Sequence, residues 1–354
     1  MFEEISPKTN KSLLKNSFIA LSVIGSLCFA AYFISSANSS ATPVDFQYNL
    51  ELEEFRSFVS RYNKNYKTEE EYYQRLRIFR DNLSYIRVFN SQGQTWYMGI
   101  NQFSDLTHEE FSTAHKKKVS VPERSMSNEK PVAAASNLQI PSQVDWTTKG
   151  CVTPVQNEGD CGSPYAFSAV GAIESAWCIA GHQLVQLSVQ EIIDCSGPFG
   201  NDGCNGGWMT NTYNFVIKNG ITSQQIYPTT GNQGKCNTAK EKQVVATISG
   251  YANVTANNAT ALETAIAIGP VAVAVDAIEA GWRNYKGGII SSNCGHSIDH
   301  AVLAVGYNLN NSPPYYKCKN SWGADWGEAG YVRISIAAGA GTCGIQIDSS
   351  YPIV

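Results

Sequence analysis

The chain has 354 residues, of which 43% are hydrophobic and 16% charged; this suits two to three domains with a large core and excludes a disordered chain or a coiled coil. Since Lys and Arg (26) are outnumbered by Asp and Glu (30), no basic surface is available for a nucleic-acid backbone, and we expect no nucleic-acid partner. Ten cysteines are heavy usage for a reducing cytosol and favour an oxidising compartment.

The N-terminus has the features of a secretory signal. Lysines precede an apolar run over residues 18–34, and small residues occupy 35–37. The run is long for a cleaved signal peptide and short for a membrane-spanning helix. Residues 1–37 are therefore predicted to be either a signal peptide or an uncleaved signal anchor, and the protein would meet a membrane only in the second case.

A chain that enters the secretory pathway is expected to reach a lysosome or vacuole, or the outside of the cell. The five Asn-x-Ser/Thr triplets that follow the apolar run would then be open to N-glycosylation, although such triplets arise often by chance. They begin at Asn38, Asn82, Asn253, Asn258 and Asn310.

Residues 46–115 are predicted to be mostly helical. Spacings of three and four place six residues on one helix face: Glu71, Arg75, Phe79, Asn82, Ile86 and Asn90. This face mixes charged, aromatic and amide groups, which suggests docking on a specific surface, with a plain amphipathic helix as the alternative. The stretch over 116–137, rich in Lys, Ser, Pro and Ala, is predicted to be an exposed, cleavable linker.

From residue 138 the composition becomes richer in Gly and Cys, and a separate domain, termed the body, is predicted over 138–354. Its first half contains helix signals: a start at Ser163-Pro164, a capping box at Ser188 and an end before Gly220. A short helix capped by Thr260 and Glu263 precedes strands predicted over 271–275, 301–307, 315–320 and 331–336. Helices followed by strands indicate two lobes with a cleft between them.

Several segments of this chain resemble papain-family cysteine proteases of the cathepsin-like group, and they occur in the family's order. In the body they are Val152–Ser168, Cys204–Gly207, Asp299–Val302 and Lys319–Gly323. The helix over 71–90 and the motif Gly99–Asp105 resemble the family's inhibitory prosegment, so residues 46–115 are termed the prosegment.

The resemblance spans about residues 50–354 and implies an α+β fold. This is the two-lobed papain-like fold, with a helical left lobe and a β-barrel-like right lobe, preceded by the helical inhibitory prosegment. It also implies that the protein is a monomer, that its own prosegment is a partner of the cleft, and that the cleft takes a peptide or protein ligand.

In this family a thiolate at a helix N-terminus faces an imidazole across the cleft, and an amide orients the imidazole. By resemblance, His300 would be the general base and acid, Asn320 its orienting residue and Trp322 an apolar shield over their hydrogen bond. A lone His before a strand can also be purely structural.

Two positions depart from the family's pattern. Pro164 stands where the nucleophilic Cys belongs and offers no nucleophile, and Glu158 stands where a Gln helps to hold the oxyanion. Proline suits the first turn of a helix and Ser163 is a natural N-cap, so the fold should tolerate the change. Cys161 lies too early to substitute for the missing thiol, and Ser163 is expected to point away from His300.

The resemblance also implies three disulfides, Cys161–Cys204, Cys195–Cys236 and Cys294–Cys343. Cys151, Cys178 and Cys318 have no partner in the family's pattern and are expected to be buried thiols or to form one added bridge, while Cys28 lies in the N-terminal apolar run. No pair has metal-ligand spacing, so neither a metal nor a cofactor is predicted.

Further residues match the family's peptide-binding positions. Gly207 matches the position whose backbone pairs with an extended substrate. The pocket for the residue two places before the scissile bond would be formed by Trp208, Met209, Ala274, Ile298 and Asp348, with Asp299 beside His300 as a further candidate. The apolar members of this set could equally belong to the core.

These patterns are compatible with three functions. The first is a papain-like protein that has lost peptidase activity and acts as a peptide- or protein-binding module. The second is an active lysosomal or secreted cysteine endopeptidase, through an unexpected nucleophile or an error at codon 164. The third is a secreted glycoprotein that keeps the fold only for stability.

Overall fold

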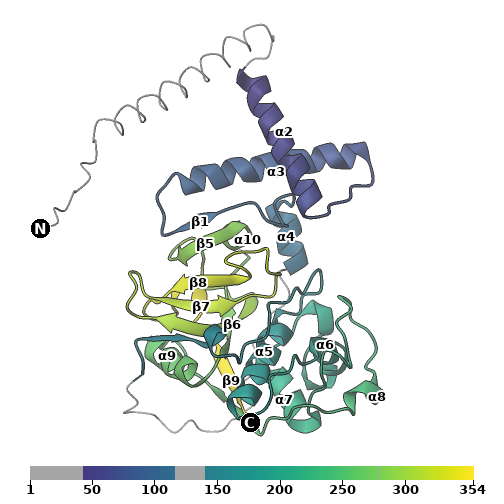
Figure 1. Cartoon of the computed structure of the whole chain (residues 1–354), viewed down its shortest axis with the longest axis vertical. Helices are drawn as coiled ribbons and strands as arrows, with labels where there is room; N and C mark the ends of the chain where they lie inside the picture. Colours follow the sequence, from purple (N-terminus) through teal and green to yellow (C-terminus); the bar gives the residue numbers. More distant parts are fainter. Residues whose placement is uncertain (1–42, 116–139, 279) are drawn as a thin grey trace, which may run out of the picture. The chain divides into compact units, whose positions relative to one another are not determined.

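A computed structural model describes residues 43–115, 140–278 and 280–354 (Figure 1). The signal or anchor over 1–37, the linker over 116–137, Asn38 and Cys28 lie outside these residues. Within the described ranges, no helix is both long enough and apolar enough to cross a membrane. The chain divides into two compact units, one ending at Lys64 and one covering Asn65–Val354.

The first unit contains helix α2 (Pro43–Arg61). Aromatic rings gather toward its C-terminal end, where the Phe58 ring lies 5.9 Å from that of Phe55 and 5.2 Å from that of Tyr62. The Nζ atom of Lys64 lies 5.5 Å from the Phe58 ring, within the range of a cation–π contact. These contacts join residues that are close in sequence at the end of the helix.

The second unit begins with the rest of the prosegment, and its longest helix is α3 (Glu69–Asn90). Thr68 caps the helix by accepting a hydrogen bond from the Glu71 N–H, and three glutamates occupy the first turn, where they complement the helix dipole. Asn82 donates to the carbonyls of Ser104 (2.8 Å) and Leu106 (2.9 Å), so the predicted mixed face docks on a specific stretch of backbone.

Strand β1 (Trp96–Met98) and helix α4 (His108–His115) complete the prosegment. Strand β1 pairs antiparallel with β5 (Tyr285–Ile290) of the body. At Gly288, with φ of +91°, a Cβ atom would lie 2.5 Å from the Trp96 Cα, so only glycine allows this close approach. Prosegment and body also share one hydrophobic cluster, to which the prosegment contributes Ile86, Phe89, Trp96, Met98 and Phe111.

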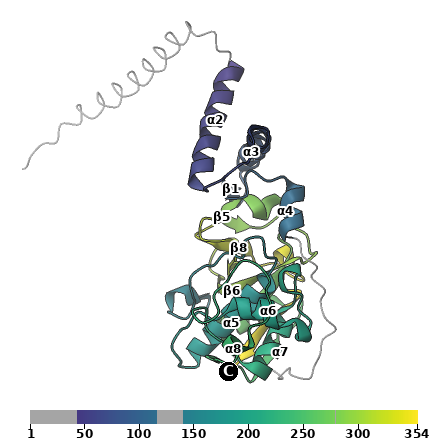
Figure 2. The same cartoon turned by 90° about the vertical axis from the view of Figure 1, so that its right-hand side faces the viewer.

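Four of the described helices of the body gather in one lobe, seen on the right in Figure 1 and facing the viewer in Figure 2. They are α5 (Pro164–Ile179), α6 (Val189–Cys195), α7 (Met209–Asn219) and α8 (Thr238–Glu241). Helix α5 is the central one, because its residues from Pro164 to Ser175 are all buried. At Gly171 an added Cβ would lie 3.0 Å from the Leu303 side chain, so the missing side chain lets α5 approach the sheet closely.

The other lobe is built on a mixed sheet, which the prosegment strand β1 extends at one edge. The strand order is β1-β5-β8-β7-β6-β4-β9-β3, and β2 also pairs with β6. All of these pairs are antiparallel except β5 with β8. The remaining strands are β2 (Gln143–Asp145), β3 (Gly250–Asn253), β4 (Val271–Val275), β6 (His300–Asn308), β7 (Tyr315–Lys319), β8 (Tyr331–Ser335) and β9 (Ser349–Ile353). Helices α9 (Ala259–Ile268) and α10 (Ala280–Asn284) accompany the sheet.

The four predicted strands agree with β4, β6, β7 and β8 to within one residue at each end, whereas two predicted helix caps were wrong. Asn258, rather than Thr260 with Glu263, caps α9 by accepting from the Ala261 N–H. Ser163 occupies the N-cap position of α5 without capping it through its side chain, because its hydroxyl donates to the Cys161 carbonyl at 3.1 Å.

Four disulfides lie in the body. Three of them are the pairs implied by the resemblance, Cys161–Cys204, Cys195–Cys236 and Cys294–Cys343, and the fourth joins Cys151 to Cys178. Among the described residues, Cys318 is the one free cysteine, and it is buried in β7.

Candidate active site

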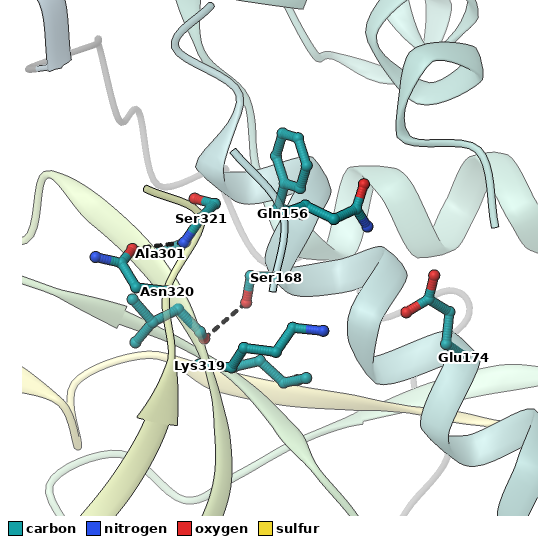
Figure 3. Close-up of a pocket in the computed structure, with 10 residues that line it drawn as sticks. Gln156, Ser168, Glu174, Ala301, Lys319, Asn320 and Ser321 are labelled. Atoms are coloured by element: carbon teal, nitrogen blue, oxygen red, sulfur yellow. Dashed lines mark hydrogen bonds between the residues drawn. The ribbon is translucent and has the colours of Figure 1, made fainter. Parts of the chain in front are cut away.

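The centre of the candidate site is a hydrogen bond between two neighbouring strands. His300 is the first residue of β6 and Asn320 comes directly after β7, and the antiparallel pairing of these strands brings the two side chains together. The Nε2 atom of His300 lies 2.8 Å from the Oδ1 atom of Asn320. This oxygen also accepts from the backbone N–H of Ser321 at 2.8 Å, and Figure 3 shows this second bond. With Oδ1 as the acceptor, the proton of a neutral imidazole resides on Nε2.

Trp322 covers this pair. Its ring lies 4.8 Å from that of His300 and is fully buried. Its indole Nε1 donates to the Oε1 atom of Glu158 at 2.8 Å, a contact that the sequence did not suggest. Glu158 is 2% exposed, and its backbone N–H donates to the Ser321 carbonyl at 2.8 Å, so it is fixed beside the His300–Asn320 pair.

The electrostatics of His300 favour a neutral ring. Burial lowers the pKa of His300 to about 4; the hydrogen bond with Asn320 opposes this shift, and nearby His115 adds to it. The second ring nitrogen, Nδ1, is buried and has no hydrogen-bond partner in the described part of the chain. None of the described residues supplies a thiolate that would stabilise an imidazolium here.

Pro164 lies across the cleft, as the first residue of α5. It lines one pocket together with His300, and no cysteine is among the described residues that form this pocket. Eight of the nine cysteines in the described part of the body are in disulfides, and the ninth, Cys318, lies in the sheet core, where burial raises the pKa of its thiol.

The predicted peptide-binding residues fall into two groups. Gly207, Trp208, Met209 and Asp299 line the pocket that contains Pro164 and His300. At Gly207 an added Cβ would lie 2.7 Å from the Tyr165 ring, so a larger residue would collide with the pocket wall.

The remaining three candidates do not line this pocket. Ala274 is fully buried in β4 and belongs to the core around α5, and Ile298 packs against the same core. Asp348 is connected to Ala274 through the backbone, since its carbonyl accepts from the Ala274 N–H at 2.9 Å.

Buried hydrogen bonds join the two lobes, and Figure 3 shows three of the residues that take part, Ser168, Glu174 and Lys319. Ser168 of α5 donates to the Val302 carbonyl of β6 at 2.7 Å. Thr153 donates to the Oε2 atom of Glu174 at 2.5 Å and accepts from the Nζ atom of Lys319 at 3.0 Å. Burial raises the pKa of Glu174 and lowers that of Lys319, while each partially offsets the shift of the other. Sequence reasoning missed this network, which holds β7, and thus Asn320, against the helical lobe.

The prosegment contacts the same site through Trp322. Gln102 donates from Nε2 to the Trp322 carbonyl at 2.6 Å. The rings of Phe103, Phe111 and His115 lie 5.7, 5.5 and 5.6 Å from that of Trp322. Trp322 is therefore packed between the His300–Asn320 pair and the prosegment.

One group in the described residues has the proximity of metal ligands: Cys195, Cys236 and Glu241. Because the two sulfur atoms are joined in a disulfide, they are not thiolates and cannot serve as ordinary metal ligands. The residues at this position therefore do not fit a metal.

Comparison with known proteins agrees with this architecture. The model for papain family cysteine proteases matches residues 140–353, and that for the cathepsin propeptide inhibitor domain (I29) matches residues 55–111. Cysteine protease XCP2 of Arabidopsis thaliana is 38% identical over 306 residues, which cover 85% of this chain and 86% of that protein.

Two solved precursor structures are similar over almost their whole length. Recombinant stem bromelain precursor has a TM-score of 0.79 at 36% identity, covering 86% of this chain and 99% of that one. Digestive procathepsin L 3 of Tenebrio molitor larval midgut has a TM-score of 0.78 at 34% identity, with the same coverage. The chain belongs to the papain family of cysteine proteases and carries the family's propeptide inhibitor domain, which confirms the two-lobed α+β fold with a helical prosegment.

The lowered pKa of His300 predicts how the free energy of unfolding depends on pH. Unfolded histidine titrates near 6.5 and folded His300 near 4, so between these values the unfolded chain binds a proton that the folded chain does not. The free energy of unfolding should therefore fall, through His300 alone, by about 2 kcal/mol between pH 7 and pH 4.5. Denaturant titrations of the full chain and of His300→Gln should show that the variant lacks this component. Parallel pH profiles for the two proteins would contradict it.

Proposed function

We propose that this protein is a papain-family member without peptidase activity that binds a peptide or protein segment in its cleft. One observation carries the proposal: the pocket that contains His300 is lined by Pro164 where the family's chemistry needs a thiol. Peptide-bond cleavage by this family requires a nucleophile that forms a covalent intermediate, and a pyrrolidine ring has none to offer.

No other described side chain is a good replacement for the thiol. Cys161 is in a disulfide, and Cys318 is in the core with its thiol pKa raised by burial. The hydroxyl of Ser163 is buried and donates to the Cys161 carbonyl. Activation of a hydroxyl needs a base within hydrogen-bonding reach, and the Ser163 proton is already engaged with that carbonyl.

Glu158 adds a second obstacle to catalysis. By resemblance it takes the place of an amide that donates a hydrogen bond to the oxyanion. The carboxylate of Glu158 has no such proton to donate, and it accepts a hydrogen bond from the Trp322 indole. A carboxylate at this place would repel the negative charge that develops on the carbonyl oxygen. Water attack assisted by neutral His300 would therefore also lack its electrostatic stabilisation.

The peptide-binding surface does not depend on the lost thiol. Gly207, Trp208, Met209 and Asp299 still line a pocket at the start of α5. We propose these four as the ligand-binding residues, with Ala274, Ile298 and Asp348 supporting the pocket floor from the adjacent core.

The second candidate is an active cysteine endopeptidase. It is favoured by the intact His300–Asn320 hydrogen bond under Trp322 and by the prosegment, and relatives such as cysteine protease XCP2 are named as proteases. This candidate needs a cysteine at position 164, so sequencing that codon separates it from the first.

Restoring the missing groups tests the first proposal. After cleavage of the linker by an added protease, the natural sequence should not hydrolyse a fluorogenic dipeptide substrate above background. Pro164→Cys should give thiol-dependent hydrolysis, because the new thiol would face His300, and adding Glu158→Gln should raise kcat by about 10²-fold through the oxyanion donor. Pro164→Ala is the matched control and should not hydrolyse the substrate above background. Turnover by the natural sequence that a covalent cysteine inhibitor blocks would refute the loss of activity.

Loss of activity also predicts how the precursor behaves in acid. Proteases of this type commonly remove their prosegment by their own activity, which this chain would lack. The purified full chain, incubated alone at pH 4–5, should therefore keep its full size on a denaturing gel, whereas Pro164→Cys with Glu158→Gln should be cut within 116–137. Unaided conversion of the natural sequence to a body-sized band would contradict the proposal.

We further propose entry into the secretory pathway, supported by the N-terminal apolar run and by the four disulfides. Glycans would be confined to Asn253, Asn258 or Asn310 among the described triplets, because the Asn82 amide is buried and both of its N–H groups are used. Translation with microsomes should yield a chain protected from added protease. A chain digested without detergent would contradict luminal entry.

A further inference from the structure

The pocket that contains Pro164 and His300 has room for one small group. It encloses about 10 Å³ of free space, which holds one group of the size of a water molecule. Tyr165, Trp208 and Met209 form part of its wall. All three are buried and belong to the core of the helical lobe, so this part of the wall is fixed by packing. The pocket therefore suits a compact head group.

The wall of this pocket has a negative charge and no positive one at neutral pH. Among the described residues that line it, none is a lysine or an arginine. Burial lowers the pKa of His300 to about 4, so the imidazole is neutral at neutral pH. The charge of the wall is therefore the carboxylate of Asp299, a residue that is only 6% exposed.

The Asp299 carboxylate is oriented by the backbone of β4 and the residues after it. Its Oδ1 atom accepts from the Ala277 N–H at 3.0 Å, and the N–H of Asp299 itself donates to the Val275 carbonyl at 2.9 Å. A carboxylate can accept up to about four hydrogen bonds, so one that the backbone orients can still accept from a ligand. An acceptor that is already oriented loses little conformational entropy when it binds.

His300 adds a second acceptor. Its Nε2 atom donates to Asn320, so in the neutral ring Nδ1 carries a lone pair. Nδ1 is buried and has no hydrogen-bond partner in the described part of the chain, and His300 lines the pocket whereas Asn320 does not. A buried polar atom without a partner costs free energy, and a donor placed in the pocket would remove that cost.

The two departures from the family's pattern change the hydrogen-bonding character of the site in the same direction. A thiolate at position 164 would favour a protonated His300, and a Gln at position 158 would offer N–H groups. In this chain the imidazole is neutral, and the Glu158 carboxylate accepts from the Trp322 indole at 2.8 Å. Each change replaces a donor by an acceptor. A carbonyl oxygen thus loses partners here, whereas a group that donates protons gains them.

We propose that the pocket binds an ammonium group carried by a peptide, held between the Asp299 carboxylate and the Nδ1 atom of His300. An ammonium group is compact, has three N–H donors and is attracted by aromatic rings such as that of Trp208. Burial of this cation is favourable only because a carboxylate pairs with it. The planar guanidinium of arginine is larger than one water molecule and should be excluded. This inference rests on the proposed binding function of the cleft and names the group that enters it.

The experiment measures binding to the full chain at neutral pH, because the described residues that line the pocket all belong to the body. The probes are fluorescently labelled, N-acetylated alanine peptides with one variable residue. The lysine peptide should bind at least about tenfold more tightly than the norleucine peptide, which has an apolar stem without the ammonium, and than the arginine peptide. A norleucine peptide with a free N-terminus shows whether an α-ammonium can replace the lysine side chain as the source.

The outcomes separate this inference from the proposed function. Equal affinities of the acetylated lysine and norleucine peptides, or no binding by any peptide of the series, would overturn the ammonium site. An arginine peptide that binds as tightly as the lysine peptide would overturn it as well. Cleavage of the lysine peptide during the incubation, detected by mass spectrometry, would instead refute the proposed loss of peptidase activity.

A substitution tests the role of the carboxylate. Asp299→Asn removes the charge and keeps an oxygen that can accept from Ala277, so it should weaken binding of the lysine peptide at least about tenfold and leave that of the norleucine peptide unchanged. Asp325→Asn is the matched control, because Asp325 is exposed, does not line the pocket and changes the net charge by the same amount. It should bind the lysine peptide like the natural sequence. Equal losses in the two variants would show a general charge effect and would refute the site.

A spectroscopic measurement on the natural sequence covers the case in which Asp299→Asn does not fold. The chain contains five histidines, and the Nδ1 resonance of His300 can be assigned in isotope-labelled protein by its absence from His300→Gln. Because a hydrogen bond to Nδ1 changes its electronic environment, the lysine peptide should shift this resonance and the acetylated norleucine peptide should not. A His300 Nδ1 resonance that stays in place when the lysine peptide is saturating would overturn the proposal.

Discussion

The packing of helix α5 against strand β6 is the constraint on which the site depends. Gly171 leaves the space that the Leu303 side chain occupies, and Ser168 ties the helix to the Val302 carbonyl. Because His300 begins the same strand and Pro164 begins the helix, this packing sets the two residues across one pocket. The relative position of these two residues is thus set by the helix and the strand, and it does not depend on which side chain begins the helix.

The architecture and the chemistry of the cleft have separate determinants. Proline fits the first turn of a helix because the N–H that it lacks has no helical partner. If Pro164 stands at the nucleophile position, as proposed, its presence there leaves α5 undisturbed. The electrostatics of the cleft do change. A thiolate would stabilise a protonated imidazole, whereas His300, buried beneath Trp322 without an opposite charge among its described partners, has its pKa lowered.

Local patterns and motifs of the family were enough to predict part of the fold and of the site. Strands β4 and β6, the three disulfides implied by the resemblance and the pairing of His300 with Asn320 were all accessible in this way. Contacts between side chains distant in the sequence were not. Arg283 with Asn82 and Trp322 with Glu158 have no periodic signature, because each depends on the three-dimensional approach of separate segments. The cap of α9 was missed for a different reason, since Asn258 and Thr260 are both good capping residues and only the backbone geometry decides between them.

Trp322 connects the cleft with the prosegment, and this has a consequence for any ligand. One surface of its ring system covers His300, while Phe103, Phe111 and His115 pack around it from the prosegment. The prosegment and the body belong to one chain, so the covalent connection sets the effective concentration at which the prosegment competes with a ligand for Trp322. This concentration does not depend on the concentration of the protein. A ligand that needs Trp322 uncovered must overcome this local competitor, whereas one that needs only the pocket at Gly207 and Trp208 need not displace those rings. A segment of the second kind is therefore the better fit to the precursor, in which prosegment and body are one chain.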